Sequence, residues 1–194
     1  MNHERLNGIL SSIDQVNNED PNQITFDNVT HPKEYIYGHQ MTNMLDEHWP
    51  QANELLKIAV RAQHIKRWHL KRAEFDLGKK GYFKWRIGLG KFHAELTERL
   101  MLENNYSEDE AKQTAKIIRK EQLKSNIDSQ TLEDVACLVF LQFYFNDFAA
   151  KHKEEKIVGV LQKTWSKMSE QGHSIALTFS LPDHLSALVA KALA

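Results

Sequence analysis

VACLVFLQFYF, from Val135 to Phe145, is the longest apolar stretch of the chain, and Gln142 alone interrupts it. Eleven residues are too few to cross a bilayer, which needs about 18, so the stretch predicts a buried core helix. Gly and Pro together supply 12 of the 194 residues, about half of their usual share. Turn-rich sheet architectures and flexible linkers are therefore poor fits, and the composition favours an all-α fold.

Apolar residues recur at intervals of three and four along most of the chain, which predicts further helices. We expect helices at 5–17, 31–48, 51–68, 82–103, 107–124, 128–152, 154–170 and 183–193, a loop at 69–81 and a short extended piece at 175–179. The sequence predicts a single domain over 1–194 with roughly eight helices. In it, 1–22 form an N-terminal helix and linker, 31–152 the core and 153–194 the C-terminal helices.

Charge and cysteine content bear on the cellular compartment of the protein. The net charge is -1 at pH 7, and Cys137 is the one cysteine, so no internal disulfide is expected. No N-terminal apolar stretch resembles a signal sequence, which favours a reducing, cytoplasmic location and no membrane association. The chain has no Walker A run and no H-E-x-x-H motif, so the P-loop nucleotidases and the zincin proteases are poor fits.

Ten residues of the chain are histidines, which draws attention to metal binding or acid–base chemistry. His64 extends the apolar line of its helix by one i+4 step, and His93 lies at the edge of the apolar stripe of its own helix. Asp134 lies on the apolar face of the most hydrophobic helix, where a cationic partner is expected. His39 and His64 differ in height by roughly 6 Å across the helical hairpin that turns at Trp49 and Pro50, so they are predicted to share a ligand.

The order of His39, His64 in QHI, His93 in KFHAE and Asp134 in LED resembles the metal-dependent HD superfamily. Those proteins are all-α, bind metal through a His, a His-Asp pair and a distant Asp, and are mostly phosphohydrolases, with a minority of iron oxygenases. More closely, RAQHIKRW (61–68), the blocks from KWR (84–86) to KFHAE (91–95) and LEDVACLVFL (132–141) resemble the family described as domain of unknown function 4202. This resemblance covers the chain from about Tyr35 to its C-terminus.

The HD resemblance implies one divalent ion, Mn, Fe, Mg, Ni, Co or Zn, held by His39, His64 and Asp134. HD proteins carry an aspartate where this chain has Ile65, so the expected site is mononuclear rather than binuclear. Glu121 or His93 is expected as a fourth ligand or a general base. The alternative is that these histidines are core-edge residues satisfied by hydrogen bonds.

A second feature is electrostatic. Between Arg61 and Lys91 the chain has ten Lys and Arg against Glu74 and Asp76, a local net charge of +8. Aromatic residues are interleaved with these cations, which suits phosphate binding with base stacking, although a solvated surface is the alternative. The candidate phosphate-binding residues are Arg61, Arg67, Trp68, Lys80, Lys84, Trp85 and Arg86.

These observations lead to one function hypothesis and two alternatives. The first is a metal-dependent hydrolase of a nucleotide or other small phosphorylated metabolite. The second is a mononuclear non-haem iron oxygenase on the same His/His/Asp site. The third is an RNA or nucleotide binding module with a decayed metal site. Metal content separates the binding module from the two enzymes, and oxygen consumption separates the enzymes from each other.

Overall fold

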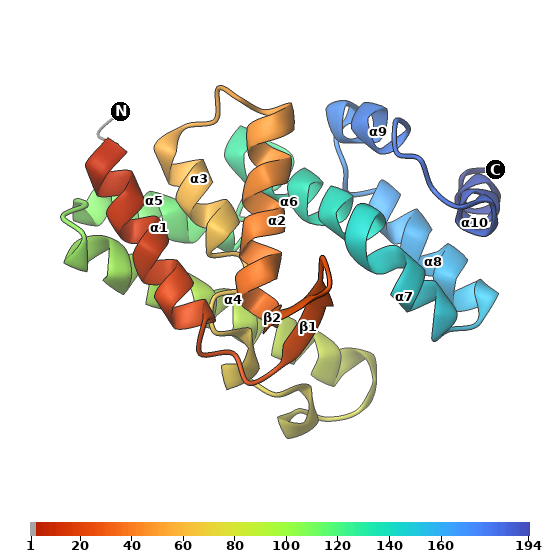
Figure 1. The fold of residues 1–194 in the computed structure, drawn as a ribbon, viewed down its shortest axis with the longest axis horizontal. Coiled ribbons are helices and arrows are strands. Elements are labelled where there is room, and N and C mark those ends of the chain that lie inside the picture. The colour runs from red at the N-terminus through yellow and green to blue at the C-terminus, as the bar shows by residue number, and fades with distance from the viewer. Residues whose placement is uncertain (1–2) are drawn as a thin grey trace. The chain divides into compact units, whose positions relative to one another are not determined.

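The computed structural model describes residues 3–194 and is 71% helical, with a single two-stranded hairpin in that range. The all-α fold class is therefore confirmed. The helices are α1 (His3–Asn17), α2 (Lys33–His48), α3 (Glu54–Arg61), α4 (Gly78–Glu103), α5 (Glu108–Ile118), α6 (Ile127–Val139), α7 (Phe145–Ala150), α8 (Glu154–Trp165), α9 (Glu170–Ala176) and α10 (Asp183–Leu193) (Figure 1). Along residues 3–194 none of the helices combines the length and apolar character that a membrane span requires.

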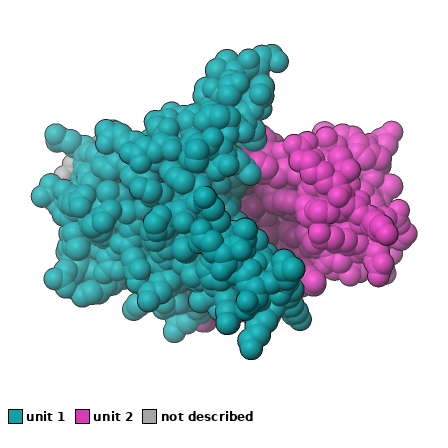
Figure 2. All heavy atoms as spheres, turned by 90° about the horizontal axis from the view of Figure 1, so that it is seen from below, with its two compact units in different colours: residues 1–122 teal, residues 123–194 magenta. Residues whose placement is uncertain are grey.

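The chain divides into two compact units, residues 1–122 and residues 123–194, which Figure 2 distinguishes by colour. Unit 1 contains α1 to α5 and the hairpin, and unit 2 contains α6 to α10. The sequence predicts a single domain, whereas the contacts within the chain group into two units. The single domain stays a prediction.

Unit 1 is built around apolar helix faces. Fully buried aliphatic side chains come from α1, α2, α3 and α4, among them Ile9, Leu45, Ile58 and Leu89. Each such side chain contributes roughly 1.5–3 kcal/mol when it leaves water. Helix α5 begins at a capping box, in which Ser107 and Glu110 satisfy each other's backbone N–H, as the sequence predicts.

A β-hairpin in unit 1 was not expected from the sequence. Strands β1 (Gln23–Phe26) and β2 (Val29–Pro32) pair antiparallel around Asp27 and Asn28, whose φ angles are 49° and 63°. Positive φ at both central residues is typical of the tight type I′ turn, which Asp and Asn tolerate. Just before the hairpin, Asp20 accepts a hydrogen bond from the backbone N–H of Glu34 and so fixes the start of α2.

Unit 2 contains the longest apolar stretch of the chain, residues 135–145. It runs through α6, a π-helical turn at Phe140–Tyr144 and the start of α7, and Val135, Leu138, Val139 and Phe145 are buried, as predicted. The extended piece expected at 175–179 is wrong, because α9 continues to Ala176 and a turn follows. The helix expected at 51–68 is also shorter, since α3 covers only Glu54–Arg61 and turns follow it. A helix could not have reached position 68 in any case, because Lys66 adopts a left-handed conformation.

Candidate functional site

A group of polar and aromatic side chains surrounds His64 in unit 1. The Nδ1 atom of His64 lies 3.2 Å from Oε2 of Glu34, whose side chain is buried. The ring of Tyr37 stacks on the imidazole of His64 with 4.0 Å between centroids. Glu34 and Tyr37 are three residues apart and therefore occupy one face of α2.

Neighbouring residues hold the turn that carries His64 in place. The side chain of Ile65 is fully buried and anchors the turn in the core. The backbone N–H of Lys66 donates to the side-chain oxygen of Asn17, at the end of α1. An isoleucine at position 65 therefore acts as a core residue, where the HD pattern has a metal ligand.

His93 approaches the same place from α4. Its side chain is 3% exposed, and its ring centroid lies 6.1 Å from that of His64. One ring nitrogen hydrogen-bonds the backbone of Gln63, while Nε2 is buried without a hydrogen-bond partner. His64 and His93, called the histidine pair below, are thus each held through one nitrogen by a carboxylate or a backbone group, an arrangement typical of metal-binding imidazoles.

The histidine pair lies in a cationic environment. Burial lowers the pKa of His64 well below its usual value, and the charges of Arg67, Arg86, Lys120 and Lys33 lower it further. Burial also lowers the pKa of His93, with contributions from His64, Arg67 and Arg86. Both imidazoles are therefore neutral at pH 7. A set of cations around uncharged polar groups attracts anions.

Glu34 supplies the negative charge of this group. Burial raises the pKa of the Glu34 carboxyl to about 7, although the charges of Arg67 and Lys33 oppose the rise. Glu34 is thus near half-ionised at neutral pH. The sequence analysis missed Glu34 and Tyr37. The available signal was their spacing of three residues, which places both side chains on one face of α2, the face that contacts His64.

His39 occupies a different face of α2. Its Nε2 atom lies 3.3 Å from Asp14 on α1, and its ring contacts Tyr35. At 3.6 residues per turn, positions 35 and 39 lie roughly 150° around the helix from positions 34 and 37. The structure therefore does not bring His39 into the group around His64.

Arg61, a candidate phosphate ligand, belongs to the group around His39. It is 8% exposed and its Nε atom lies 3.5 Å from Asp14. Burial lowers the pKa of Arg61, and the charge of Asp14 opposes this. Arg61 thus serves as the internal partner of a carboxylate in unit 1.

Among the other predicted phosphate-binding residues, Arg67 and Arg86 act electrostatically on the histidine pair. The guanidinium of Arg67 is 5.0 Å from the centroid of the Trp85 ring, and the indole N–H of Trp85 donates to the carbonyl of Leu70. Trp68 and Trp85 are half-buried, whereas Arg86, Lys80 and Lys84 are exposed on α4. Glu121, predicted as a general base, lies on the surface and pairs with Arg119 at 2.7 Å.

Asp134, the third predicted metal ligand, belongs to unit 2. Its carboxylate accepts hydrogen bonds from the backbone N–H and the hydroxyl of Ser169, and from the side chain of Gln130. Gly172 packs so closely that a Cβ atom there would lie 2.9 Å from this carboxylate. Asp134 is a residue of α6, and neutral donors hold its carboxylate against the start of α9. A metal site that it shares with His39 and His64 stays a prediction.

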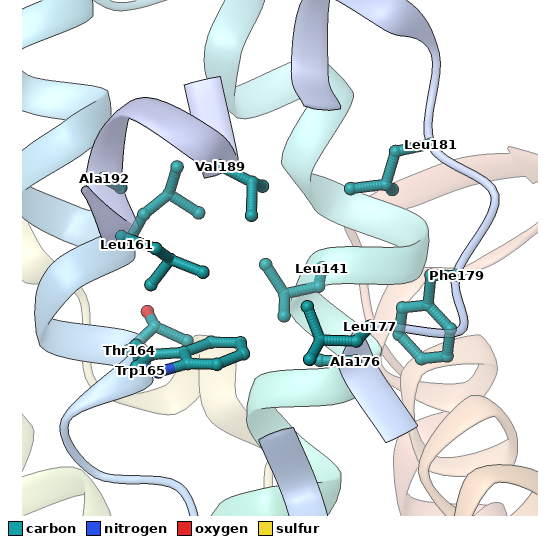
Figure 3. A pocket seen from close by; sticks show the side chains of 11 residues that line it. Leu141, Leu161, Thr164, Trp165, Ala176, Leu177, Phe179, Leu181, Val189 and Ala192 are labelled. Carbon is teal, nitrogen blue, oxygen red and sulfur yellow. The ribbon is translucent and has the colours of Figure 1, made fainter. Parts of the chain in front are cut away.

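Two further observations limit where a ligand can bind. In unit 2, side chains including Leu141, Leu161, Leu177 and Val189 point into a common apolar pocket (Figure 3). Its cavity is about 30 Å³ and no charged side chain lines it, so it offers a phosphate group no ionic partner. Within residues 3–194 no three His, Cys, Asp or Glu side chains gather closely enough to hold a metal ion by themselves.

We expect Glu34→Gln to change the pH dependence of stability. A carboxyl group whose folded pKa is raised binds more protons in the folded state, so its contribution to stability is present below pH 4.5 and is lost as pH rises toward 7. Above pH 7 the variant should therefore be more stable than the parent by about 3 kcal/mol, and near pH 4.5 the two should be equal. Urea unfolding at pH 5 and pH 8 measures this difference. Glu47→Gln, an exposed position on the same helix, is the control and should show no such trend.

We expect Asp134→Asn to destabilise the protein by about 2 kcal/mol, because the amide replaces an acceptor with a donor that faces Ser169 or Gln130. Thermal and urea unfolding of the full chain measure this loss. Asp147→Asn, at an exposed position on α7, is the matched control. Unchanged stability for Asp134→Asn, together with a loss of bound metal, would contradict the structural role and support the metal-ligand role.

The fold and this site define a predominantly helical protein whose N-terminal unit encloses a histidine pair among cations. The chain belongs to the domain of unknown function 4202 family, whose family model matches residues 7–189. Comparison of the chain with curated proteins and with solved structures gives no match. The likeness to the HD superfamily therefore stays a prediction.

Proposed function

We propose that unit 1 hydrolyses the phosphate ester of a nucleotide or another small phosphorylated metabolite, with a divalent ion at the histidine pair. The observation that carries this proposal is the arrangement of His64 and His93, which are neutral, 6.1 Å apart between ring centroids, and each held through one nitrogen. The unpartnered, buried Nε2 of His93 is an unsatisfied polar atom that a ligand would satisfy.

The residues present fit a metal ion that binds together with phosphate. Two imidazoles are fewer than the three or four protein ligands of most zinc sites, so phosphate oxygens and water would complete the ligand set. The surrounding cations weaken the binding of a bare dication and strengthen the binding of an ion that arrives with phosphate charge. When bound, such an ion polarises a phosphoryl oxygen and activates water.

The other side chains of the site have separate roles in this proposal. Arg67 and Arg86 bind phosphate oxygens, for which a guanidinium is well suited. Stacking of Arg67 on Trp85 limits the conformations of its side chain, so less entropy is lost on binding. Ionised Glu34 orients the imidazole of His64 through Nδ1 and favours the tautomer whose Nε2 accepts.

The test is a phosphate-release assay of the purified full chain on nucleotides and sugar phosphates, with Mn, Mg, Fe, Co, Ni or Zn supplied in turn. We expect metal-dependent phosphate release from at least one substrate. Calorimetry should also show that Mn²⁺ binds at least tenfold more tightly with inorganic phosphate present. Absence of product in all combinations, with no effect of phosphate on metal binding, would exclude the proposal. Oxygen consumption with ferrous iron would favour the oxygenase alternative instead.

A further inference from the structure

An open depression on the surface of unit 2 is lined mainly by basic side chains. Its volume is about 620 Å³, within the usual range for small-molecule sites. Four lysines, one histidine and one carboxylate line it, and they are Lys151, His152, Lys153, Glu155, Lys156 and Lys163. We call this place the α8 depression, and it shares no residue with the histidine pair or with the apolar pocket.

The register of α8 places lysines at both ends of the depression. Lys156, Gly159 and Lys163 recur at intervals of three and four residues, so they lie on one face of the helix. Lys156 and Lys163 are separated by a rise of roughly 10 Å along the axis. A Cβ atom at Gly159, between them, would meet nothing within 4 Å. The middle of the α8 depression is therefore open space between two cationic ends.

The four lysines of the α8 depression carry charge that no carboxylate neutralises. Within residues 3–194 none of them forms an ion pair, whereas Lys167 pairs with Glu133 and Lys191 pairs with Glu154. Unit 2 as a whole has seven Lys against eight Asp and Glu, so its positive charge is concentrated here. Like charges held together repel one another, and a bound anion relieves this repulsion.

His152 adds a neutral donor to the lysines. The Nζ atom of Lys156 lies 3.3 Å from Nδ1 of His152. An ammonium group can only donate, so Nδ1 accepts and the imidazole hydrogen lies on Nε2. The ring of Phe148 packs edge-on against this imidazole, with 4.4 Å between the centroids. His152 is therefore held from two sides and provides an N–H group that suits an anion.

From this arrangement we propose that the α8 depression binds a small molecule that carries two or more phosphate groups. Such a ligand contacts the lysines at both ends at once, which a single phosphate does only by drawing the like charges together. A nucleic-acid strand fits less well, because no aromatic ring for base stacking is among the lining residues. A membrane surface also fits less well, because a hollow whose rim has no large apolar side chain offers lipid nothing to insert.

Calorimetry of the full chain with inorganic triphosphate tests the proposal. The buffer is freed of divalent ions with a chelating resin, because the proposed site at the histidine pair takes phosphate together with a metal ion. We expect triphosphate to bind at least tenfold more tightly than orthophosphate. Lys153→Gln, Lys156→Gln and Lys163→Gln combined should weaken triphosphate binding at least tenfold.

A neutral substitution separates binding inside the depression from general attraction to its charge. Gly159→Leu places an apolar side chain in the open space and leaves every charge in place, so it should weaken triphosphate binding at least fivefold. Gly159→Ala is its control, because a single methyl group fills little of the space, and its affinity should stay within threefold of the parent. Thermal unfolding checks that both variants are folded.

The charge control removes three lysines from unit 1. Lys79→Gln, Lys80→Gln and Lys84→Gln combined change exposed positions of α4 and should alter triphosphate affinity less than threefold. Equal affinity for triphosphate and orthophosphate, equal effects of the two triple variants, or undiminished binding by Gly159→Leu would each overturn the proposal. Tighter binding of single-stranded RNA or of anionic lipid vesicles than of triphosphate would also overturn it. Absence of hydrolysis at the histidine pair would not, because the α8 depression lies in unit 2.

Discussion

Gly81→Ala should lower the free energy of unfolding by about 3 kcal/mol and displace the segment that carries Arg67 and Leu70. A Cβ atom at position 81 would lie 1.9 Å from the carbonyl oxygen of Asp76, closer than any real contact of this kind. The obstacle is backbone, so a side-chain rotation cannot relieve it. Urea unfolding measures the loss of stability, and Trp85 fluorescence should report the loss of its hydrogen bond to Leu70.

Gly90→Ala is the matched control, because it lies in the same helix and its Cβ would meet nothing within 4 Å. It should stabilise the protein by up to about 1 kcal/mol, the usual preference for alanine over glycine in a helix. The same stability for both variants would show that α4 and the segment before it are not packed as described.

Local signals predicted much of the fold. The serine at 107 and the glutamate at 110 gave the start of α5, because a capping box is encoded within four residues. The hairpin at 23–32 was missed even though Asp27 and Asn28 form a tight turn, since its strands have only four residues each and little apolar alternation. α3 ends at Arg61, and the left-handed Lys66 that follows in the turn is marked by no sequence pattern.

The candidate site shows a different limit. The heights of His39 and His64 along the helical hairpin follow from residue counts. The face of α2 on which His39 lies is a separate question, and the prediction of a shared ligand left it out. Glu34 and Tyr37 contact His64 from one face of α2, whereas His39 contacts Asp14 from another. Two histidines share a ligand only if they lie at the same height and also point toward each other. His39 and His64 have no contact with each other that the structure shows, and His39 lies on a different face of α2 from the residues that contact His64.

His93 was predicted as a fourth ligand or a general base, and the structure shows that it lies next to His64. Its place at the edge of the α4 stripe followed from helical periodicity, but its proximity to His64 is a tertiary contact between residues 29 positions apart. Periodicity assigns a residue to a face of its own helix and does not identify the neighbour that this face meets. The cationic surroundings were predicted from the local charge of +8, although Arg61 turned out to be buried against Asp14.

His64→Gln and His93→Gln should each lower metal-dependent phosphate release by about 10²-fold or more, and each should lower the affinity for Mn²⁺ measured with phosphate present. Glutamine keeps a polar side chain of similar reach but offers no imidazole nitrogen, so the fold should change little. His39→Gln is the comparison variant. It should leave turnover within about threefold of the parent, because His39 contacts Asp14 and Tyr35 instead of the histidine pair.

The three variants together distinguish two possible metal sites. One is the histidine pair, and the other is the set of His39, His64 and Asp134. If His39→Gln and His64→Gln abolish turnover and metal binding while His93→Gln does not, the set of His39, His64 and Asp134 is supported and the histidine pair is wrong. A loss for His64→Gln and His93→Gln alone supports the pair, because an imidazole that only fills space or orients a neighbour would not change metal affinity and turnover together. Equal turnover for all three variants and the parent would place the chemistry outside this part of unit 1.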